Sequence, residues 1–197
     1  MNRWLAGQGW LREAAADFYD AAALAVTVYV ASWAWLRRPG TSRVVRNEMV
    51  LALLISFAVF TLFPVAPPRL EGGHFLDITA HGGSIRSWYG AYSQYLDQIA
   101  ALPSIHVISA CWCLLAVRKL VRRRKVRLLL ELAGAAYVVL TGLVVMATAN
   151  HYLLDVLAAA LTSVIAVVLA EFVLPRVRLR RGLAGSGRGG GRRFFPG

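Results

Sequence analysis

Cysteine is scarce in this chain, and its two copies, Cys111 and Cys113, stand two residues apart inside one apolar run. On a helix such a pair points to different faces, so we expect no structural disulfide. Acidic residues are also few, with 10 Asp and Glu against 22 Lys and Arg. The first 16 residues hold no sustained apolar core, so we expect no signal peptide. The net charge of +12 has to be explained by where the basic residues stand.

Basic residues are confined to short stretches between long uncharged ones. Apolar residues make up 58% of the chain, which is more than a soluble domain usually carries. A nucleic-acid-binding protein would gather its basic residues on one folded face. Here they flank the apolar segments instead, as they do in membrane proteins. We therefore expect an integral membrane protein whose partners are membrane lipids and not nucleic acid.

Helices that cross a bilayer need about 20 apolar residues, and five segments of the chain come close to that length. These segments are residues 18–36, 49–68, 98–117, 132–150 and 152–174. The last two are nearly continuous, so we expect a tight turn near Ala149–His151. The sequence predicts an all-α integral membrane bundle of five transmembrane helices, or six if the N-terminal segment also crosses. We place that segment, residues 1–16, as an amphipathic interfacial helix on the membrane surface.

The connections between these segments differ sharply in charge. The link after the first span, the link after the third span and the tail carry four, seven and seven Lys and Arg, 18 of the chain's 22. In a five-span bundle all three lie on one side, which the positive-inside rule assigns to the cytoplasm. We expect a multi-pass plasma-membrane protein with its N-terminus outside, a membrane domain at residues 17–175 and a cytoplasmic tail. That tail, residues 176–197, is rich in Gly and Arg, so we expect it to be disordered and to bind anionic lipids, with RNA binding as the less favoured alternative.

Polar residues that are far apart in the sequence fall at the outer ends of the predicted spans. Arg69 follows the second span, and His106 stands near the start of the third. His151 and Asp155 lie at the junction of the fourth and fifth spans. The predicted topology brings all of them to one depth on the extracytoplasmic side. Because ionisable residues in a membrane are costly and usually functional, we expect a site there.

The spacing within these clusters suits phosphate chemistry. His151 and Asp155 are four residues apart and so share a helix face, where the carboxylate can orient the imidazole and leave its other nitrogen basic. Ser104 can cap the helix that carries His106, and exposed amides at such an N-terminus bind anions. His106 can donate a proton to a leaving oxygen. Arg69 offers a planar fork of donors that fits phosphate.

Each of these residues also has an ordinary structural interpretation when taken alone. A histidine in a span can be a packing residue, Ser104 a simple cap, and Arg69 an interfacial anchor. No cluster of carboxylates suggests a magnesium site, and the spacing of His74, Asp77 and His81 resembles a metal site only weakly. We therefore expect no metal and no cofactor.

Three short motifs carry a resemblance to a known family. Pro-Ser-Ile-His at residues 103–106 resembles the Pro-Ser-Gly-His motif of the type 2 phosphatidic acid phosphatase superfamily. His-x-x-x-Asp at residues 151–155 resembles the end of that superfamily's third motif. Pro-Pro-Arg at residues 67–69, together with Asn-His-Tyr at 150–152, is similar to the branch that contains inositol phosphorylceramide synthases. The resemblance covers roughly residues 45–175.

The resemblance implies a metal-independent mechanism through a phosphohistidine. In it His151 is the nucleophile, Asp155 orients it and His106 is the general acid. Arg69 and Ser104 hold the phosphate. The implied core has six spans, one more than we count.

The chain departs from the phosphatase pattern at two cations. Leu62 stands where the pattern has a Lys, and Val145 stands where it has an Arg. These departures favour the transferase-like branch, so hydrolysis and transfer to a polyol both stay open. The other interpretations are a transporter or a non-catalytic membrane protein that uses the same polar cluster to bind an anion. The oligomeric state, the lipid and its head group are not predicted.

Overall fold

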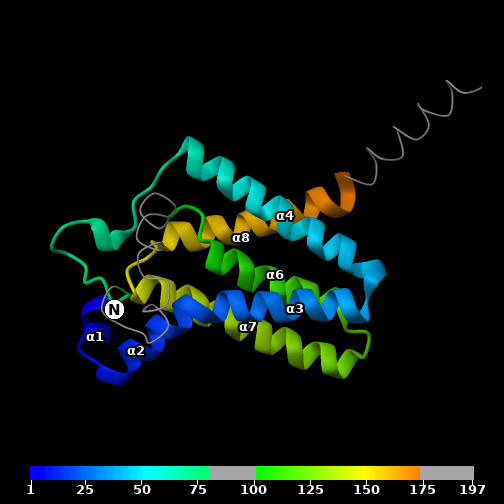
Figure 1. Ribbon diagram of the computed structural model, residues 1–197, viewed down its shortest axis with the longest axis horizontal. Helices are drawn as coiled ribbons and strands as arrows, with labels where there is room; N and C mark the ends of the chain where they lie inside the picture. Colours follow the sequence, from blue (N-terminus) through cyan, green and yellow to red (C-terminus); the bar gives the residue numbers. More distant parts are fainter. Residues whose placement is uncertain (80–100, 174–197) are drawn as a thin grey trace, which may run out of the picture.

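The computed structural model describes residues 1–79 and 101–173 of the chain, and the predicted tail at 176–197 lies outside them. Within these ranges the fold is helical, as predicted, and Figure 1 shows an elongated bundle. Four helices in these described ranges are long and apolar enough to cross a membrane, which indicates a multi-pass membrane protein. These helices are Gly9–Arg37, Pro39–Leu62, Arg124–Ala147 and Leu153–Phe172.

The first long helix is continuous through three labelled segments. It runs from α2 (Gly9–Asp17) through the π-helical η1 (Phe18–Ala22) into α3 (Ala23–Arg37). No proline or further glycine interrupts it, so nothing stops a helix that begins at Gly9. Residues 9–16, which we had assigned to a separate surface segment, therefore form its first turns.

The short helix α1 (Asn2–Ala6) precedes the first long helix and is tied to the rest of the bundle. The Asn2 side chain donates to the carbonyl oxygens of Leu76, at 3.0 Å, and Ala147, at 2.9 Å. Leu5 beside it is buried. These contacts hold α1 on the bundle, and its position relative to a membrane surface stays a prediction.

The remaining long helices follow the predicted order. Helix α4 covers Pro39–Leu62 and α7 covers Arg124–Ala147. Helix α8 (Leu153–Val168) continues as the π-helical η4 (Leu169–Val173). A 3-10 turn, η2 (Pro68–Leu70), lies in the segment that follows α4.

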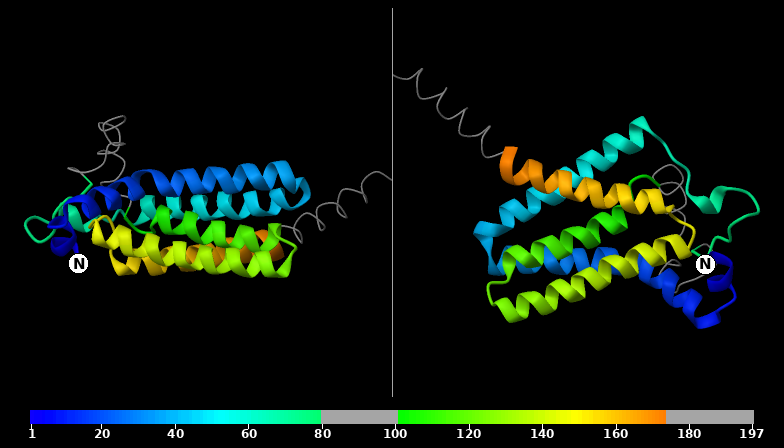
Figure 2. Two further views of the ribbon diagram at one scale, coloured as in Figure 1. Left: turned by 90° about the horizontal axis from the view of Figure 1, so that it is seen from below. Right: turned by 180° about the vertical axis from the view of Figure 1, so that it is seen from behind.

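Helix α6 (Ile105–Leu120) is the central element and packs against α3, α4, α7 and α8. Figure 2 shows it enclosed by the other helices. Its 16 residues give a length of only about 24 Å. It begins later than the predicted third span because Pro103 and Ser104 come before it and Ser104 caps it. Since α6 is shorter than the four membrane-length helices, a count of five or six spans stays a prediction.

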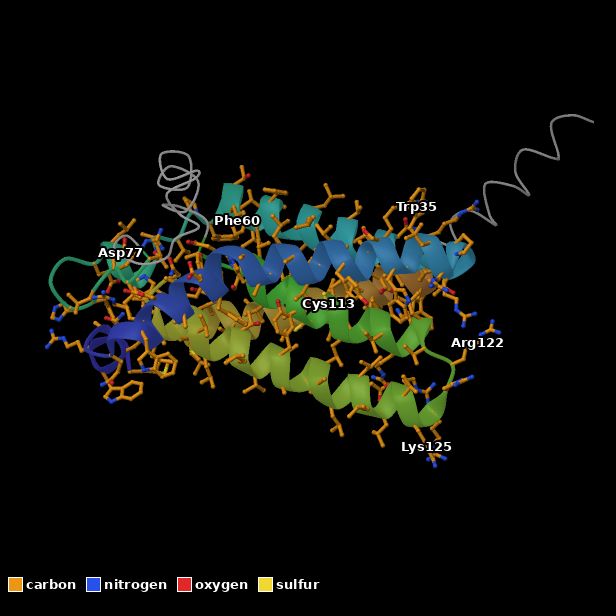
Figure 3. All side chains as sticks on the ribbon, turned by 60° about the horizontal axis from the view of Figure 1, so that its bottom comes forward. Trp35, Phe60, Asp77, Cys113, Arg122 and Lys125 are labelled. Carbon is orange, nitrogen blue, oxygen red and sulfur yellow. The ribbon has the colours of Figure 1, made fainter. Side chains whose placement is uncertain are left out.

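The two ends of the bundle have different chemistry. The α3–α4 and α6–α7 connections lie at one end, which we call the basic end, and Figure 3 shows Arg122 and Lys125 there. The α7–α8 turn lies at the opposite end, which we call the site end. The predicted turn near Ala149–His151 is confirmed, and Ala149 adopts a left-handed φ of 58° to reverse the chain.

Candidate active site

The two histidines that the sequence singled out lie close together at the site end. His106 is in the first turn of α6, and His151 is in the turn between α7 and α8. Their ring centroids are 6.3 Å apart and the rings are inclined at 58°. His151 is buried, whereas His106 is half-buried. A small group bound between the two rings, with contacts of about 3 Å to each, can therefore touch both.

The orientation of the His151 ring is fixed by a backbone carbonyl. Its Nδ1 lies 2.8 Å from the carbonyl oxygen of Ala101. A carbonyl oxygen only accepts hydrogen bonds, so Nδ1 must carry the proton and donate it. In the neutral ring the lone pair then belongs to Nε2, which is the nitrogen a nucleophile needs.

Asp155 lies beside Nδ1 of His151, but its short hydrogen bond is with the backbone of Tyr152. Its Oδ2 is 3.5 Å from Nδ1 of His151 and accepts from the backbone N–H of Tyr152 at 2.7 Å. Asp155 is the third residue of α8, and an acidic side chain there folds back to cap the helix start. We had expected this carboxylate to be the hydrogen-bond acceptor for the imidazole. In the structure the carbonyl oxygen of Ala101 is the closer partner of the imidazole. Asp155 is a buried carboxylate close to the ring.

Ser104 connects the starts of α6 and α8. Its hydroxyl oxygen accepts from the backbone N–H of Val107, at 3.5 Å, and this confirms the predicted N-cap of α6. Its own backbone N–H donates to the carbonyl oxygen of Asp155 at 3.3 Å. Ser104 is fully buried. The bond to Asp155 fixes the start of α6, and with it His106, relative to the start of α8.

Arg69 reaches the turn that carries His151. Its backbone N–H donates to the carbonyl oxygen of Ala149 at 2.9 Å, and its Nη1 donates to the side-chain oxygen of Asn150. Its Nε lies 3.5 Å from Oδ2 of Asp77. The side chain is 6% exposed. A buried guanidinium thus contacts the turn that carries His151, and its role in binding phosphate stays a prediction.

The weak metal-site pattern involves residues that the structure places differently. Asp77 pairs with Arg69, and His81 lies outside the described residues. In the described ranges, 1–79 and 101–173, no group of three or more His, Cys, Asp or Glu side chains could hold a metal ion.

Two neighbours of His106 were missed by the sequence reasoning. Tyr19 stacks on the His106 ring, with ring centroids 4.1 Å apart and an angle of 24° between the planes. Asp20 lines a cavity of ≈ 270 Å³ that also contains His106 and Ser109. Both residues lie in the π-helical segment η1, a feature that is frequent at functional sites. The available signal was Asp20 itself, an acid at the start of an apolar run.

The two positions where the phosphatase pattern has cations are occupied by apolar residues in this chain, and the structure shows where each of them lies. Leu62 ends α4 and is exposed on the outside of the bundle. Val145 is buried in a core cluster with Val107 and Ile108. Its carbonyl oxygen accepts from the backbone N–H groups of Asn150 and His151, both at 3.1 Å. Val145 therefore shapes the turn that carries His151, through its backbone.

In the described part of the chain, a helical bundle with membrane-length helices and two neighbouring histidines at one end defines a class of multi-pass membrane protein with a polar site at that end. A family model described as the PAP2 superfamily matches residues 1–169, and the chain belongs to this superfamily. Its members are generally phosphatases, so membership points to phosphatase or phosphotransfer chemistry on lipid phosphates. No curated protein and no solved structure shows a significant match to the chain.

Proposed function

We propose that the protein is a membrane-embedded enzyme that moves a phosphoryl group from a lipid phosphate or phosphodiester through a phosphohistidine on His151. The observation that carries the proposal is the pair of rings with centroids 6.3 Å apart, one of which has its Nδ1 bound to the Ala101 carbonyl. That bond assigns the Nδ1 proton to the backbone contact, so in the neutral ring the lone pair for attack is on Nε2. A packing histidine needs no such arrangement with a second histidine.

The proposed reaction has two steps. In the first, Nε2 of His151 attacks phosphorus, the bond from phosphorus to the lipid alkoxide oxygen breaks, and protonated His106 gives that oxygen its proton. In the second, water or an acceptor alcohol attacks phosphorus while His106 takes its proton and the bond to Nε2 breaks. Arg69 and the amide groups at the start of α6 stabilise the phosphoryl oxygens. Asp155 stabilises the positive charge that His151 gains when it is phosphorylated.

The acceptor in the second step decides the reaction: water gives hydrolysis, and an alcohol gives transfer. We propose transfer to an acceptor alcohol, as the resemblance to the branch that contains inositol phosphorylceramide synthases implies, with a polyol as the first acceptor to test. The support is the apolar setting of Leu62 and Val145, which leaves the site without the two extra cations of the phosphatase pattern.

The side of the membrane follows from the charge of the two ends. The basic end holds the α3–α4 and α6–α7 connections, and 11 Lys and Arg lie in these connections or in the helix ends that flank them. By the positive-inside rule this end faces the cytoplasm. We propose that the site end faces the outside of the plasma membrane and takes its lipid from the outer leaflet.

The decisive experiment separates the two acceptors. Purified protein is incubated with radiolabelled lipid phosphates and phosphodiesters, with and without inositol or other polyols, in buffer that contains EDTA. When the polyol is present, its hydroxyl replaces water in the second step. We then expect a labelled polyol phosphate from a lipid phosphate donor and a new labelled phosphodiester from a phosphodiester donor. Free phosphate as the sole product would favour hydrolysis. Loss of all turnover in EDTA would contradict the metal-independent mechanism.

The stacked ring of Tyr19 gives a prediction about His106. Replacing Tyr19 by leucine removes an aromatic contact worth about 1 kcal/mol, and we expect kcat to fall about fivefold with little change in KM. Phenylalanine keeps the stacked ring, so Tyr19→Phe should retain nearly full activity. Equal losses in the leucine and phenylalanine variants would show that the stacking does not position His106.

A further inference from the structure

Two cavities lie beside α6, where α3 and α4 pack against it. The cavity that contains His106 and Asp20 is also lined by Thr27 and Met49. A second cavity, of ≈ 290 Å³, is lined by the same two residues and extends toward the basic end. Because Thr27 and Met49 line both, the two cavities adjoin. We call them together the α3–α4 groove.

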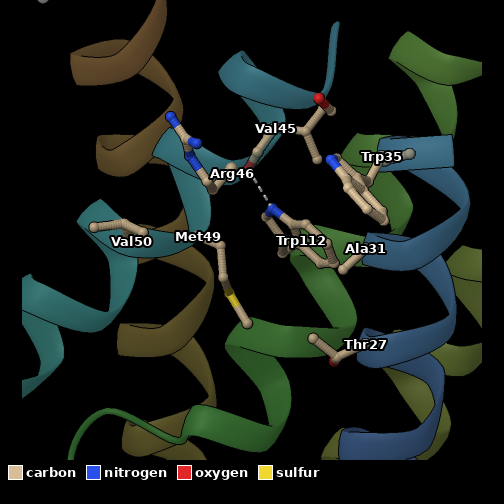
Figure 4. Close-up of a pocket in the computed structure, with 10 residues that line it drawn as sticks. Thr27, Ala31, Trp35, Val45, Arg46, Met49, Val50 and Trp112 are labelled. Atoms are coloured by element: carbon tan, nitrogen blue, oxygen red, sulfur yellow. Dashed lines mark hydrogen bonds between the residues drawn. The ribbon is translucent and has the colours of Figure 1, made fainter. Parts of the chain in front are cut away.

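The floor of the groove is formed by α6. His106, Ser109 and Trp112 follow one another at intervals of three residues and so lie along one face of the helix. The indole N–H of Trp112 donates to the carbonyl oxygen of Val45 on α4, at 2.7 Å, and fixes the floor to one wall. Figure 4 shows Trp112 between α4, with Met49 and Val50, and α3, with Thr27 and Ala31.

The rims of the groove reach the outer surface of the bundle. Leu24 and Trp35 on α3 and Val50 on α4 line the two cavities and are 69%, 72% and 47% exposed. In a membrane this surface faces the lipid chains. The groove therefore opens sideways, toward the hydrocarbon of the bilayer, and its polar end at Asp20, His106 and Ser109 joins the candidate active site.

The groove is long compared with one leaflet. From Asp20 to Trp35 there are 15 residues of helix, which correspond to about 22 Å. A hydrocarbon core of about 30 Å gives each leaflet about 15 Å. A chain that starts at His106 and follows the groove to Trp35 therefore passes the middle of the bilayer.

We propose that the α3–α4 groove binds the hydrocarbon chain of the lipid substrate and that it favours a lipid phosphate with a chain longer than one leaflet is thick. The phosphate lies at His106 and the chain end lies beside Trp35 and Trp112. The inference rests on the proposed function for the identity of the polar end. The groove itself is defined by the packing of α3, α4 and α6.

The test compares two adjacent positions on α3. Ala31 lines the second cavity and is exposed enough to accept a larger side chain, whereas Ser32 is exposed and lines neither cavity. The probes are dodecyl phosphate and docosenyl phosphate, which share a head group and differ in chain length. We expect the wild-type protein to prefer the longer probe in kcat/KM.

Filling the groove should remove this preference. In Ala31→Phe we expect the ratio of kcat/KM for the long probe to that for the short probe to fall about tenfold, because the phenyl ring displaces a few methylene groups from the groove. Ser32→Phe should keep the wild-type ratio. Equal ratios in the two variants, or no chain-length preference in the wild type, would overturn the proposal.

A crosslinking measurement distinguishes failure of the groove from failure of the enzyme proposal. Docosenyl phosphate with a diazirine at the chain end is irradiated with the His151→Ala variant, which keeps the probe intact, and the labelled peptides are sequenced. We expect labels on α3 and α4 near Ala31, Trp35 and Val50. Labels spread over the outward faces of α7 and α8 would show that bulk lipid alone holds the chain. If the wild-type protein turns over neither probe, the proposed function fails and the labelling pattern alone decides on the groove.

Discussion

Replacing His151 by alanine is expected to reduce turnover of a lipid phosphate by at least about a thousandfold, as the loss of a nucleophile does in other enzymes with a covalent intermediate. The imidazole is the group that Ala101 orients, and the variant has no other nitrogen at that place. The same variant should lose the acid-labile, base-stable label that wild-type protein acquires when a labelled substrate is quenched during turnover. Both quantities are measured on protein purified in detergent.

The matched control is His74→Ala, since His74 is an exposed histidine in the segment that follows α4. It should keep full activity. A second comparison separates the roles of the two site histidines. With a p-nitrophenyl ester, whose leaving group needs no proton, His106→Ala should recover the release of p-nitrophenolate in the first turnover, whereas His151→Ala should release none. Full activity of His151→Ala on the natural type of substrate would rule out the mechanism.

The grouping of the site residues could be predicted from the sequence because it depends on topology. Alternating apolar and basic segments fix which span ends lie together, and Arg69, His106 and His151 each follow or begin such a segment. The structure places all three at one end of the bundle. The N-cap at Ser104 and the turn at Ala149 were also predictable, since both depend on local residue types.

The detailed partners could not be predicted because they depend on packing. The carbonyl of Ala101 has no signature in the sequence, yet it is the group that orients His151. Tyr19 meets His106 through the tertiary packing of η1, which is distant from α6 in the sequence. The carboxylate of Asp155 had two available donors, a ring nitrogen and the Tyr152 amide. Spacing alone cannot decide between such donors.

A partly buried group of charges near the basic end links three helical segments. Lys119 on α6 is paired with Glu48 on α4 and with Glu171 in η4. Glu48 is 1% exposed, so its carboxylate depends on this lysine for compensation. Removing one partner of a buried ion pair is far more harmful than the pair itself is stabilising, because a charge is left without compensation.

Lys119→Met is therefore expected to lower the free energy of unfolding by about 3–5 kcal/mol. The methionine keeps the length of the side chain but leaves two carboxylates close together without a cation. Unfolding is followed by tryptophan fluorescence in detergent, with Lys125→Met, at an exposed position in the first turn of α7, as the matched control. The control should unfold like the wild type. Equal stability of the two variants would contradict a structural role for the pair.

A double variant tests the electrostatic cause directly. Adding Glu48→Gln to Lys119→Met replaces the uncompensated carboxylate by a neutral amide, so we expect the double variant to recover part of the lost stability. Lys119 is at the end of α6 opposite His106, so at low temperature, where the variants stay folded, turnover per folded molecule should match the wild type. Loss of turnover without loss of stability would instead mean that the charges at the basic end control the position of α6, and with it the distance between the two histidines.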